Sequence, residues 1–253
     1  MATSPPYDRC SLANRRDWKP LGALVLMLLC ATGCNNFDAQ ARNAEGVRMF
    51  QQARYHEALR HFQEANYADA KNVDAYYNLG AAYHRLGVVE QNETYLRQAE
   101  NYYEMAVDRS DEHGEAYRGL AVLLADQGRT QEAFTLLESW VEKRPDLPDP
   151  RIELARLSEE FGDRAHAEAR LTEALELNPN SDRAWAALAR LREQAGDHES
   201  ALRGYERSLW HNRFQPEVAQ RIAVLRSRAQ PSHVLDAPPG GTRLVEQGDP
   251  SLH

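Results

Sequence analysis

The residues that come closest to a catalytic arrangement are His56, Glu57 and His61. A zinc hydrolase carries two histidines and a glutamate on one helix, with the histidines four residues apart so that both face the metal. Here the two histidines are five residues apart, which places them about 140° from each other around a helix. We therefore interpret them as a turn residue and a surface residue, and not as metal ligands.

Other catalytic patterns are also missing from the sequence. It contains no glycine-rich phosphate loop, no G-x-S-x-G motif and no H-E-x-x-H motif. The acidic pair Glu159-Glu160 is typical of a solvated helix face, and His166 is interpreted as an ordinary helix-surface residue. We expect no catalytic site, metal, cofactor or small-molecule substrate, and predict that the protein is not an enzyme.

The charge of the chain argues against nucleic acid as a partner. The net charge is −8 and the isoelectric point is about 5.6, whereas binding to phosphates requires a basic stripe. All three cysteines, Cys10, Cys30 and Cys34, lie near the N-terminus. The remainder of the chain therefore has neither a disulfide framework nor a thiolate metal site.

Residues 1–33 have the layout of a targeting segment. Basic side chains precede an apolar run over residues 21–29, which is shorter than the ~20 residues needed to cross a bilayer. The sequence Ala31-Thr32-Gly33-Cys34 then resembles the bacterial lipoprotein processing site, although that family favours leucine where Ala31 stands. The resemblance implies cleavage before Cys34 and its lipidation; an uncleaved anchor and an ordinary cleaved signal peptide are the alternatives.

The residue after the cysteine bears on localisation. It is Asn35 and not aspartate, and by resemblance to lipoprotein sorting in Gram-negative bacteria this indicates the outer membrane. Residues 34–38 would then be a short lipid-anchored linker. The expectation is a protein of the bacterial cell envelope that is lipid-anchored and faces the periplasm.

The body of the chain follows a helical pattern that must position any binding residues. In the stretch from Asp74 to Gly87, apolar residues recur at the spacing of one helix face, at Tyr76, Leu79, Tyr83 and Leu86. Gly80 lies within this face, where glycine lowers helix propensity by roughly 1 kcal/mol relative to alanine. Its presence predicts that a second helix backbone approaches closely.

Small residues equivalent to Gly80 recur along the chain. They are Gly46, Gly80, Ala121, Ala155, Ala189 and Ala223, at steps of 34, 41, 34, 34 and 34 residues. In most units a second small residue follows twelve positions later, as at Ala58, Ala133, Ala167 and Ala201. Seven positions after the first small residue stands Gly87, Gly128, Gly162 or Gly196, each predicted to be a left-handed C-cap.

Units of 34 residues made of two helices resemble the tetratricopeptide repeat. The resemblance implies an all-α fold, a right-handed α-solenoid of about five helix pairs with a C-terminal capping helix. The expected repeats are residues 39–72, 73–113, 114–147, 148–181 and 182–215, followed by the capping helix 216–228. Residues 229–253 are rich in proline and glycine and are expected to be a disordered tail.

Two repeats depart from the pattern. Repeat two has seven extra residues between Gly87 and Ala99, and their apolar spacing predicts a second helix lengthened by two turns. In repeat three, Trp140 replaces a small residue. This predicts either a bend in the array or a wider gap to repeat four.

The resemblance also implies a concave groove, lined by the first helix of each pair, that holds an extended peptide or a partner helix. The expected groove residues are Asn43, Phe50, Tyr77, Asn78, His84, Arg118, Arg156, Arg190 and Arg221. The first part is aromatic and rich in amides, whereas the last three arginines form a basic line predicted to recognise an acidic segment. A carboxylate-clamp groove is excluded, because Val47, Glu115 and Gly119 replace residues that it needs.

Together these features predict a non-enzymatic interaction scaffold or adaptor. It would bind a protein partner and attach to the envelope membrane through its lipid. In layout it resembles the tetratricopeptide lipoproteins that serve as pilotins or outer-membrane assembly factors. The alternative is a regulatory docking subunit of an envelope enzyme such as a peptidoglycan hydrolase or protease.

Overall fold

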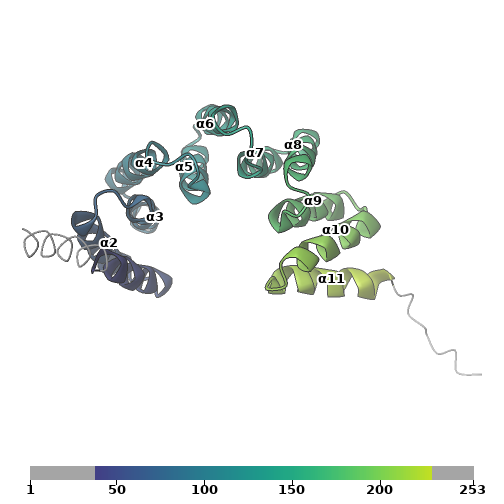
Figure 1. The fold of residues 1–253 in the computed structure, drawn as a ribbon, viewed down its shortest axis with the longest axis horizontal. Helices are drawn as coiled ribbons and strands as arrows, with labels where there is room; N and C mark the ends of the chain where they lie inside the picture. The colour runs from purple at the N-terminus through teal and green to yellow at the C-terminus, as the bar shows by residue number, and fades with distance from the viewer. Residues whose placement is uncertain (1–37, 230–253) are drawn as a thin grey trace, which may run out of the picture. The chain divides into compact units, whose positions relative to one another are not determined.

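The computed structural model describes residues 38–229, and every regular element in that range is an α-helix (Figure 1). The expected signal peptide at residues 1–33, the lipidation site Cys34 and the tail beyond residue 229 lie outside the described residues. Among the described helices, none is long and apolar enough to cross a membrane.

The chain divides into two compact units between Pro145 and Asp146. The first unit contains a helix over residues 38–51, α2 (Tyr55–Ala68), α3 (Val73–Val89), α4 (Glu93–Val107), α5 (Gly114–Asp126) and α6 (Thr130–Lys143). The second contains α7 (Asp149–Glu160), α8 (Arg164–Leu177), α9 (Asp182–Gln194), α10 (His198–His211) and α11 (Pro216–Ala229).

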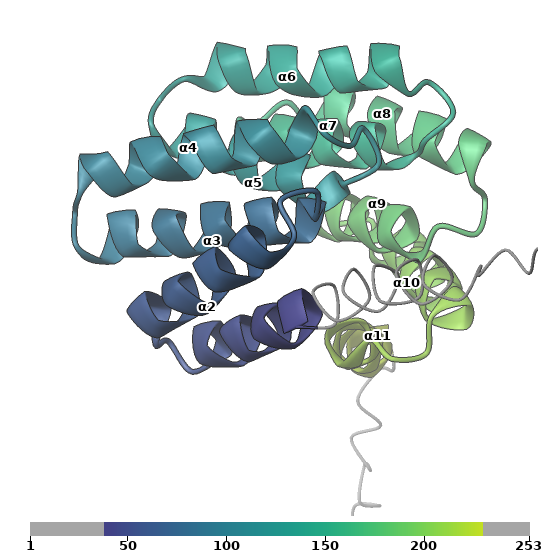
Figure 2. The same ribbon diagram turned by 60° about the vertical axis from the view of Figure 1, so that its left-hand side comes forward.

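Within each unit the helices pack as successive hairpins. The first helix of a repeat packs against its own second helix, as α3 does on α4 and α9 on α10. Figure 2 shows α3 lying along α4. First helices of neighbouring repeats also touch, in the pairs α3–α5 and α7–α9. The prediction of an all-α solenoid built from helix pairs is confirmed.

The small residues lie where helices approach most closely. The second small residues Ala58, Ala133, Ala167 and Ala201 are completely buried, as are Ala121 and Ala189 in the first helices. A Cβ atom built on Gly204 would lie 2.9 Å from the Cβ of Ala189, so α9 and α10 are in contact at this point. The role predicted from their spacing is confirmed for these positions. It is wrong for Ala223, which is exposed on α11, the last helix of the described residues.

Helix ends are fixed by local hydrogen bonds. Five N-cap side chains each accept a hydrogen bond from the backbone N–H three residues later. These N-cap residues are Asn72, His113, Asp163, Ser181 and Asp197. Gly128, Gly162 and Gly196 follow first helices with φ values of +76°, +82° and +83°. These three glycines confirm the predicted left-handed C-caps, which glycine adopts without a steric penalty from a Cβ.

The prediction for Gly87 is wrong, and so is the prediction of a lengthened second helix. Gly87 lies inside α3, where a Cβ would meet Leu96 of α4 at 2.5 Å. Helix α3 has 17 residues against 13 in α5, whereas α4 has 15 against 14 in α6. The insertion therefore lengthens mainly the first helix, by about one turn. The chain then turns at Gln91, which has a φ of +51°.

Trp140 is accommodated inside the first unit. Its side chain is fully buried and stacks on Tyr117 of α5, with the ring centroids 4.2 Å apart. Its indole Nε1 donates a hydrogen bond to the Asp111 carbonyl at 2.6 Å. The bulk of the indole is thus taken up by α5 and the connection that precedes it, an arrangement the sequence did not predict.

Tyr103 of α4 is the side chain that joins the first helices of repeats two and three. Its ring is 3% exposed, and Cβ atoms built on Gly80 of α3 and Gly119 of α5 would lie 2.6 and 2.7 Å from it. Real Cβ atoms essentially never come this close. The two glycines therefore form a slot that only a residue without a side chain can provide.

This slot predicts opposite effects for two glycines of the same helix. Gly119→Ala should lower the free energy of unfolding by about 1 kcal/mol, because overpacking against the Tyr103 ring outweighs the better helix propensity of alanine. Gly114→Ala is the matched control and should raise the free energy of unfolding, since its Cβ would meet Trp140 at an ordinary 3.4 Å. Urea denaturation measures both, and equal stability changes would contradict the slot.

Candidate functional site

The first-helix face of the first unit joins two predicted asparagines. Asn78 of α3 donates a hydrogen bond from Nδ2 to Oδ1 of Asn43, at 2.9 Å, and both side chains are half-buried. An amide side chain can donate two hydrogen bonds and accept two. The pair bridges successive first helices and uses only one N–H and one carbonyl to do so.

Tyr77 directly precedes Asn78 on α3. Its ring lies 6.1 Å from the ring of Tyr103 and 5.2 Å from that of His113, and it is half-buried. Burial raises the pKa of the Tyr77 hydroxyl, the charge of Glu115 raises it further, and the charge of Arg118 on α5 opposes both. The charge of Arg118 on α5 thus acts on the Tyr77 hydroxyl. Because the pKa of that hydroxyl lies above its usual value, the phenol stays neutral near pH 7.

His84 lies about two helical turns after Tyr77 on α3. Its ring packs edge-on against Tyr103 at 6.2 Å, and Nε2 lies 3.8 Å from the carboxylate of Asp126. Phe50 behaves differently, because it packs against the core of the first repeat and makes an edge contact with Tyr55. The structure therefore groups Tyr77 and His84 around Tyr103 and assigns Phe50 mainly a packing role.

The three arginines of the predicted basic line lie in the second unit, on α7, α9 and α11. Arg190 contacts Glu159 through Nε at 3.2 Å and Nη2 at 2.6 Å. Arg221 binds both carboxylate oxygens of Glu193. Arg156 pairs with Glu153 and Glu160, at 3.2 and 3.3 Å. Each arginine therefore has a carboxylate partner, so the local charge of this line is balanced.

In the Arg190–Glu159 and Arg221–Glu193 pairs, the carboxylate is the more deeply buried member. The side chains of Glu159 and Glu193 are 15% and 8% exposed, whereas those of Arg190 and Arg221 are both 49% exposed. Burial alone would raise the pKa of Glu193, but hydrogen bonds from Arg221 and Tyr205 bring the pKa below its usual value. The carboxylate thus holds each guanidinium in place while about half of the arginine side chain is exposed.

Sequence reasoning did not predict these inter-repeat pairs, although a signal for them exists. Glu159 and Arg190 are 31 residues apart, and Glu193 and Arg221 are 28 apart. Both separations are one repeat period less about one or two helical turns. Opposite charges at that separation mark contacts between successive first helices.

A serine–histidine contact occurs in the second unit. Oγ of Ser158 lies 3.1 Å from Nδ1 of His166, so His166 is not the plain surface residue that was predicted. Ser158 is fully buried and donates its own proton to the Leu154 carbonyl, and Arg170 donates to Nε2 of His166. Nδ1 must then carry the ring proton, so His166 cannot act as a base toward Ser158.

The histidines that came closest to a metal motif have separate partners. His56 lies 2.7 Å from Glu90, whereas His61 lies 3.9 Å from Glu64. Within residues 38–229, no group of three or more histidine, cysteine or acidic side chains has a geometry suited to a metal ion.

The sequence matches models of the tetratricopeptide repeat in both units. The matches cover residues 46–87, 73–104, 96–148 and 159–223. Together with the helix pairs, they show that the chain belongs to the tetratricopeptide repeat family, as the sequence predicted. Members of this family are typically non-enzymatic scaffolds that bind protein partners.

Solved structures share this fold. The thermophilic TPR protein TTC0263 of Thermus thermophilus is 23% identical, with a TM-score of 0.57 over 75% of this chain and 99% of that chain. A chain of the APC/C hetero-tetramer Cut9–Hcn1 is 18% identical, with a TM-score of 0.52 over 77% and 37%. No curated protein matches the sequence significantly. At these identities the likeness concerns the fold alone.

The environment of His84 predicts how it titrates. Burial lowers its pKa below the usual 6.5, and the negative charge of Asp126 partly opposes this shift. Between its folded pKa and its unfolded pKa of 6.5, His84 therefore binds fewer protons in the folded state than in the unfolded state. The stability contributed by neutral His84 is complete above pH 6.5 and is lost as pH falls through the folded pKa.

An NMR titration of the His84 ring should give a midpoint below 6.5. Asp126→Asn should lower that midpoint further, because it removes the charge that favours imidazolium. Asp74→Asn, whose carboxylate faces His113 at 3.0 Å, is the control and should leave His84 unchanged. A higher midpoint in Asp126→Asn would contradict the assigned contact.

Proposed function

We propose that the protein is a non-catalytic adaptor of the bacterial envelope that binds a peptide or partner helix on its first-helix faces. The observation that carries this proposal is the hydrogen-bonded pair Asn43 and Asn78, with the half-buried Tyr77 directly before Asn78 on α3. A half-buried aromatic ring beside amides with unused bonding capacity suits a polypeptide, which offers both apolar side chains and backbone amides.

On the second unit, the arginines would orient a segment of the partner that lies on the first-helix face of that unit. Each guanidinium carries five N–H donors, and the pairs with Glu159 and Glu193 use two donors each. Since the pairs are charge-balanced, they contribute little long-range attraction. Their remaining donors would bind acceptors of the partner at short range. On the first unit, the ring of Tyr77 is expected to supply most of the affinity.

The aromatic contribution can be tested with a tyrosine pair. Tyr77→Ala should weaken binding by roughly 2 kcal/mol, about thirtyfold in Kd, as truncation of a central aromatic residue does at interfaces. Tyr67→Ala is the matched control, because this tyrosine of α2 is 93% exposed. The measurement is retention of partners from an envelope extract, followed by a Kd for the partner identified.

The arginine contribution has a different salt dependence. Replacement of Arg156, Arg190 and Arg221 by alanine would uncover their carboxylates, so an acidic segment should be lost mainly at low salt, where charge repulsion is least screened. Tyr77→Ala should lose the partner at any salt. If the tyrosine and arginine variants both retain the partner as the unmodified protein does, the first-helix faces are not the binding site.

Attachment to the membrane is proposed from the sequence around Cys34. The small residues Ala31-Thr32-Gly33 precede the cysteine, and the first described helix begins at residue 38. Lipoprotein processing would add more than one acyl chain, which makes a stable anchor at ~0.8 kcal/mol per buried methylene. Asn35 supports the outer membrane, so the scaffold would work close to the periplasmic surface of that membrane.

Replacement of the cysteine tests this part separately. Cys34→Ser should release the protein from the membrane fraction while its helical circular dichroism stays unchanged, because Cys34 lies outside the described helices. Mass spectrometry of the N-terminal peptide should show the acyl groups in the unmodified protein. An N-terminal peptide without acyl groups would exclude the lipoprotein assignment, whatever the outcome for partner binding.

A further inference from the structure

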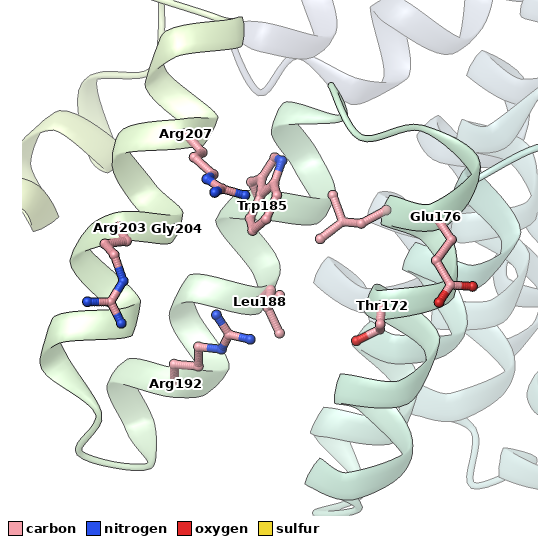
Figure 3. Close-up of a pocket in the computed structure, with 9 residues that line it drawn as sticks. Thr172, Glu176, Trp185, Leu188, Arg192, Arg203, Gly204 and Arg207 are labelled. Carbon is pink, nitrogen blue, oxygen red and sulfur yellow. The ribbon is translucent and has the colours of Figure 1, made fainter.

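A pocket of about 370 Å³ lies in the second unit, between α8, α9 and α10 (Figure 3). It is separate from the face that carries Arg190 and Glu193. At 100° per residue, the mean direction of the pocket residues Trp185, Leu188 and Arg192 lies about 140° around α9 from that of Arg190 and Glu193. Any ligand of this pocket would therefore be additional to the ligand proposed above.

The floor of the pocket is apolar and firmly held. Leu188 is 3% exposed, and Leu175 and Trp185 pack against the same core. The indole Nε1 of Trp185 donates a hydrogen bond to the Pro179 carbonyl at 2.8 Å, which fixes the orientation of the ring. A concave apolar floor of this size accepts one aliphatic side chain.

The rim of the pocket is positively charged. Arg192, Arg203 and Arg207 line it, against Glu176 as the one acidic lining residue. Arg192 lies 3.6 Å from Glu168, and Arg203 is paired with Glu199. The lining residues alone therefore carry a net positive charge, in a chain whose overall charge is −8.

Arg207 is the distinctive member of this rim. Its guanidinium lies 4.5 Å from the centroid of the Trp185 ring, and Figure 3 shows it pointing toward the indole. No carboxylate between residues 38 and 229 pairs with it. A stacked guanidinium keeps its N–H edge available and is already oriented, so it can bind a carboxylate with little further loss of entropy.

We propose that this pocket binds an acidic protein segment, which inserts one aliphatic side chain between Leu175 and Leu188 and places a carboxylate on Arg207. The positively charged rim around the apolar floor is complementary to such a segment. The segment would combine a leucine-like residue with flanking glutamate or aspartate. Because the pocket and the first-helix face lie on different sides of α9, the protein could hold two segments at once.

The test follows the indole N–H signal of Trp185 by NMR in the full chain, assigned through Trp185→Phe. The probes are two blocked peptides, Glu-Glu-Leu-Glu-Glu and Lys-Lys-Leu-Lys-Lys. The acidic peptide should shift the signal and saturate, whereas the basic peptide should not. Replacement of the leucine by glycine should lower the affinity of the acidic peptide, because no side chain then contacts the apolar floor.

Charge reversal of the rim gives the second readout. Arg207→Glu should lower the affinity for the acidic peptide at least tenfold. Arg203→Glu should lower it less, since that arginine also pairs with Glu199. Arg228→Glu is the matched control on α11, exposed and outside the pocket, and should change the affinity less than twofold. Tyr77→Ala should have no effect, which separates this site from the function proposed above.

Several results would overturn the proposal. These are no shift with the acidic peptide at millimolar concentration, an equal shift with the basic peptide, and an equal loss of affinity in Arg228→Glu. Competition by oligothymidylate as strong as by peptide would identify the site as one for nucleic acid. A signal that moves with protein concentration before peptide is added would identify a second copy of the chain as the occupant.

Discussion

The insertion of Tyr103 between two glycines is the constraint on which the first unit depends. The ring comes from a second helix, α4, yet it contacts both neighbouring first helices at positions where no Cβ can fit. It also lies within 6.2 Å of the rings of Tyr77 and His84. The buried Tyr103 ring therefore fixes the orientation of Tyr77 and His84 on the candidate binding face.

The second unit orients its exposed side chains in another way. Buried carboxylates such as Glu193 hold half-exposed guanidinium groups, and Tyr205 adds a hydrogen bond to the same carboxylate at 3.0 Å. An arginine fixed in this manner has lost its conformational freedom before any partner arrives. The two units thus prepare their faces differently, one by aromatic packing and the other by ion pairs.

The sequence predicted those features that depend on local geometry. The glycine C-caps and the small residues of the helix interfaces follow from the repeat period alone. The sequence did not indicate which helix of repeat two the seven inserted residues lengthen, because an apolar period of 3.6 fits an extension of either helix equally well. The roles of Gly87 and Gly119 depended on Leu96 and Tyr103, partners on other helices. Such contacts require the angle between helices, which spacing within one helix does not contain.

The Tyr103 slot also limits how this array can evolve. Tetratricopeptide arrays change length when whole repeats are lost or duplicated, because each repeat contacts only its neighbours. Here repeat two must be followed by a first helix with glycine at the position of Gly119. The residue 34 positions later is Glu153, so loss of repeat three would bring a carboxylate against the buried ring. Repeat two therefore depends on repeat three, whose first helix supplies the glycine that the Tyr103 ring requires.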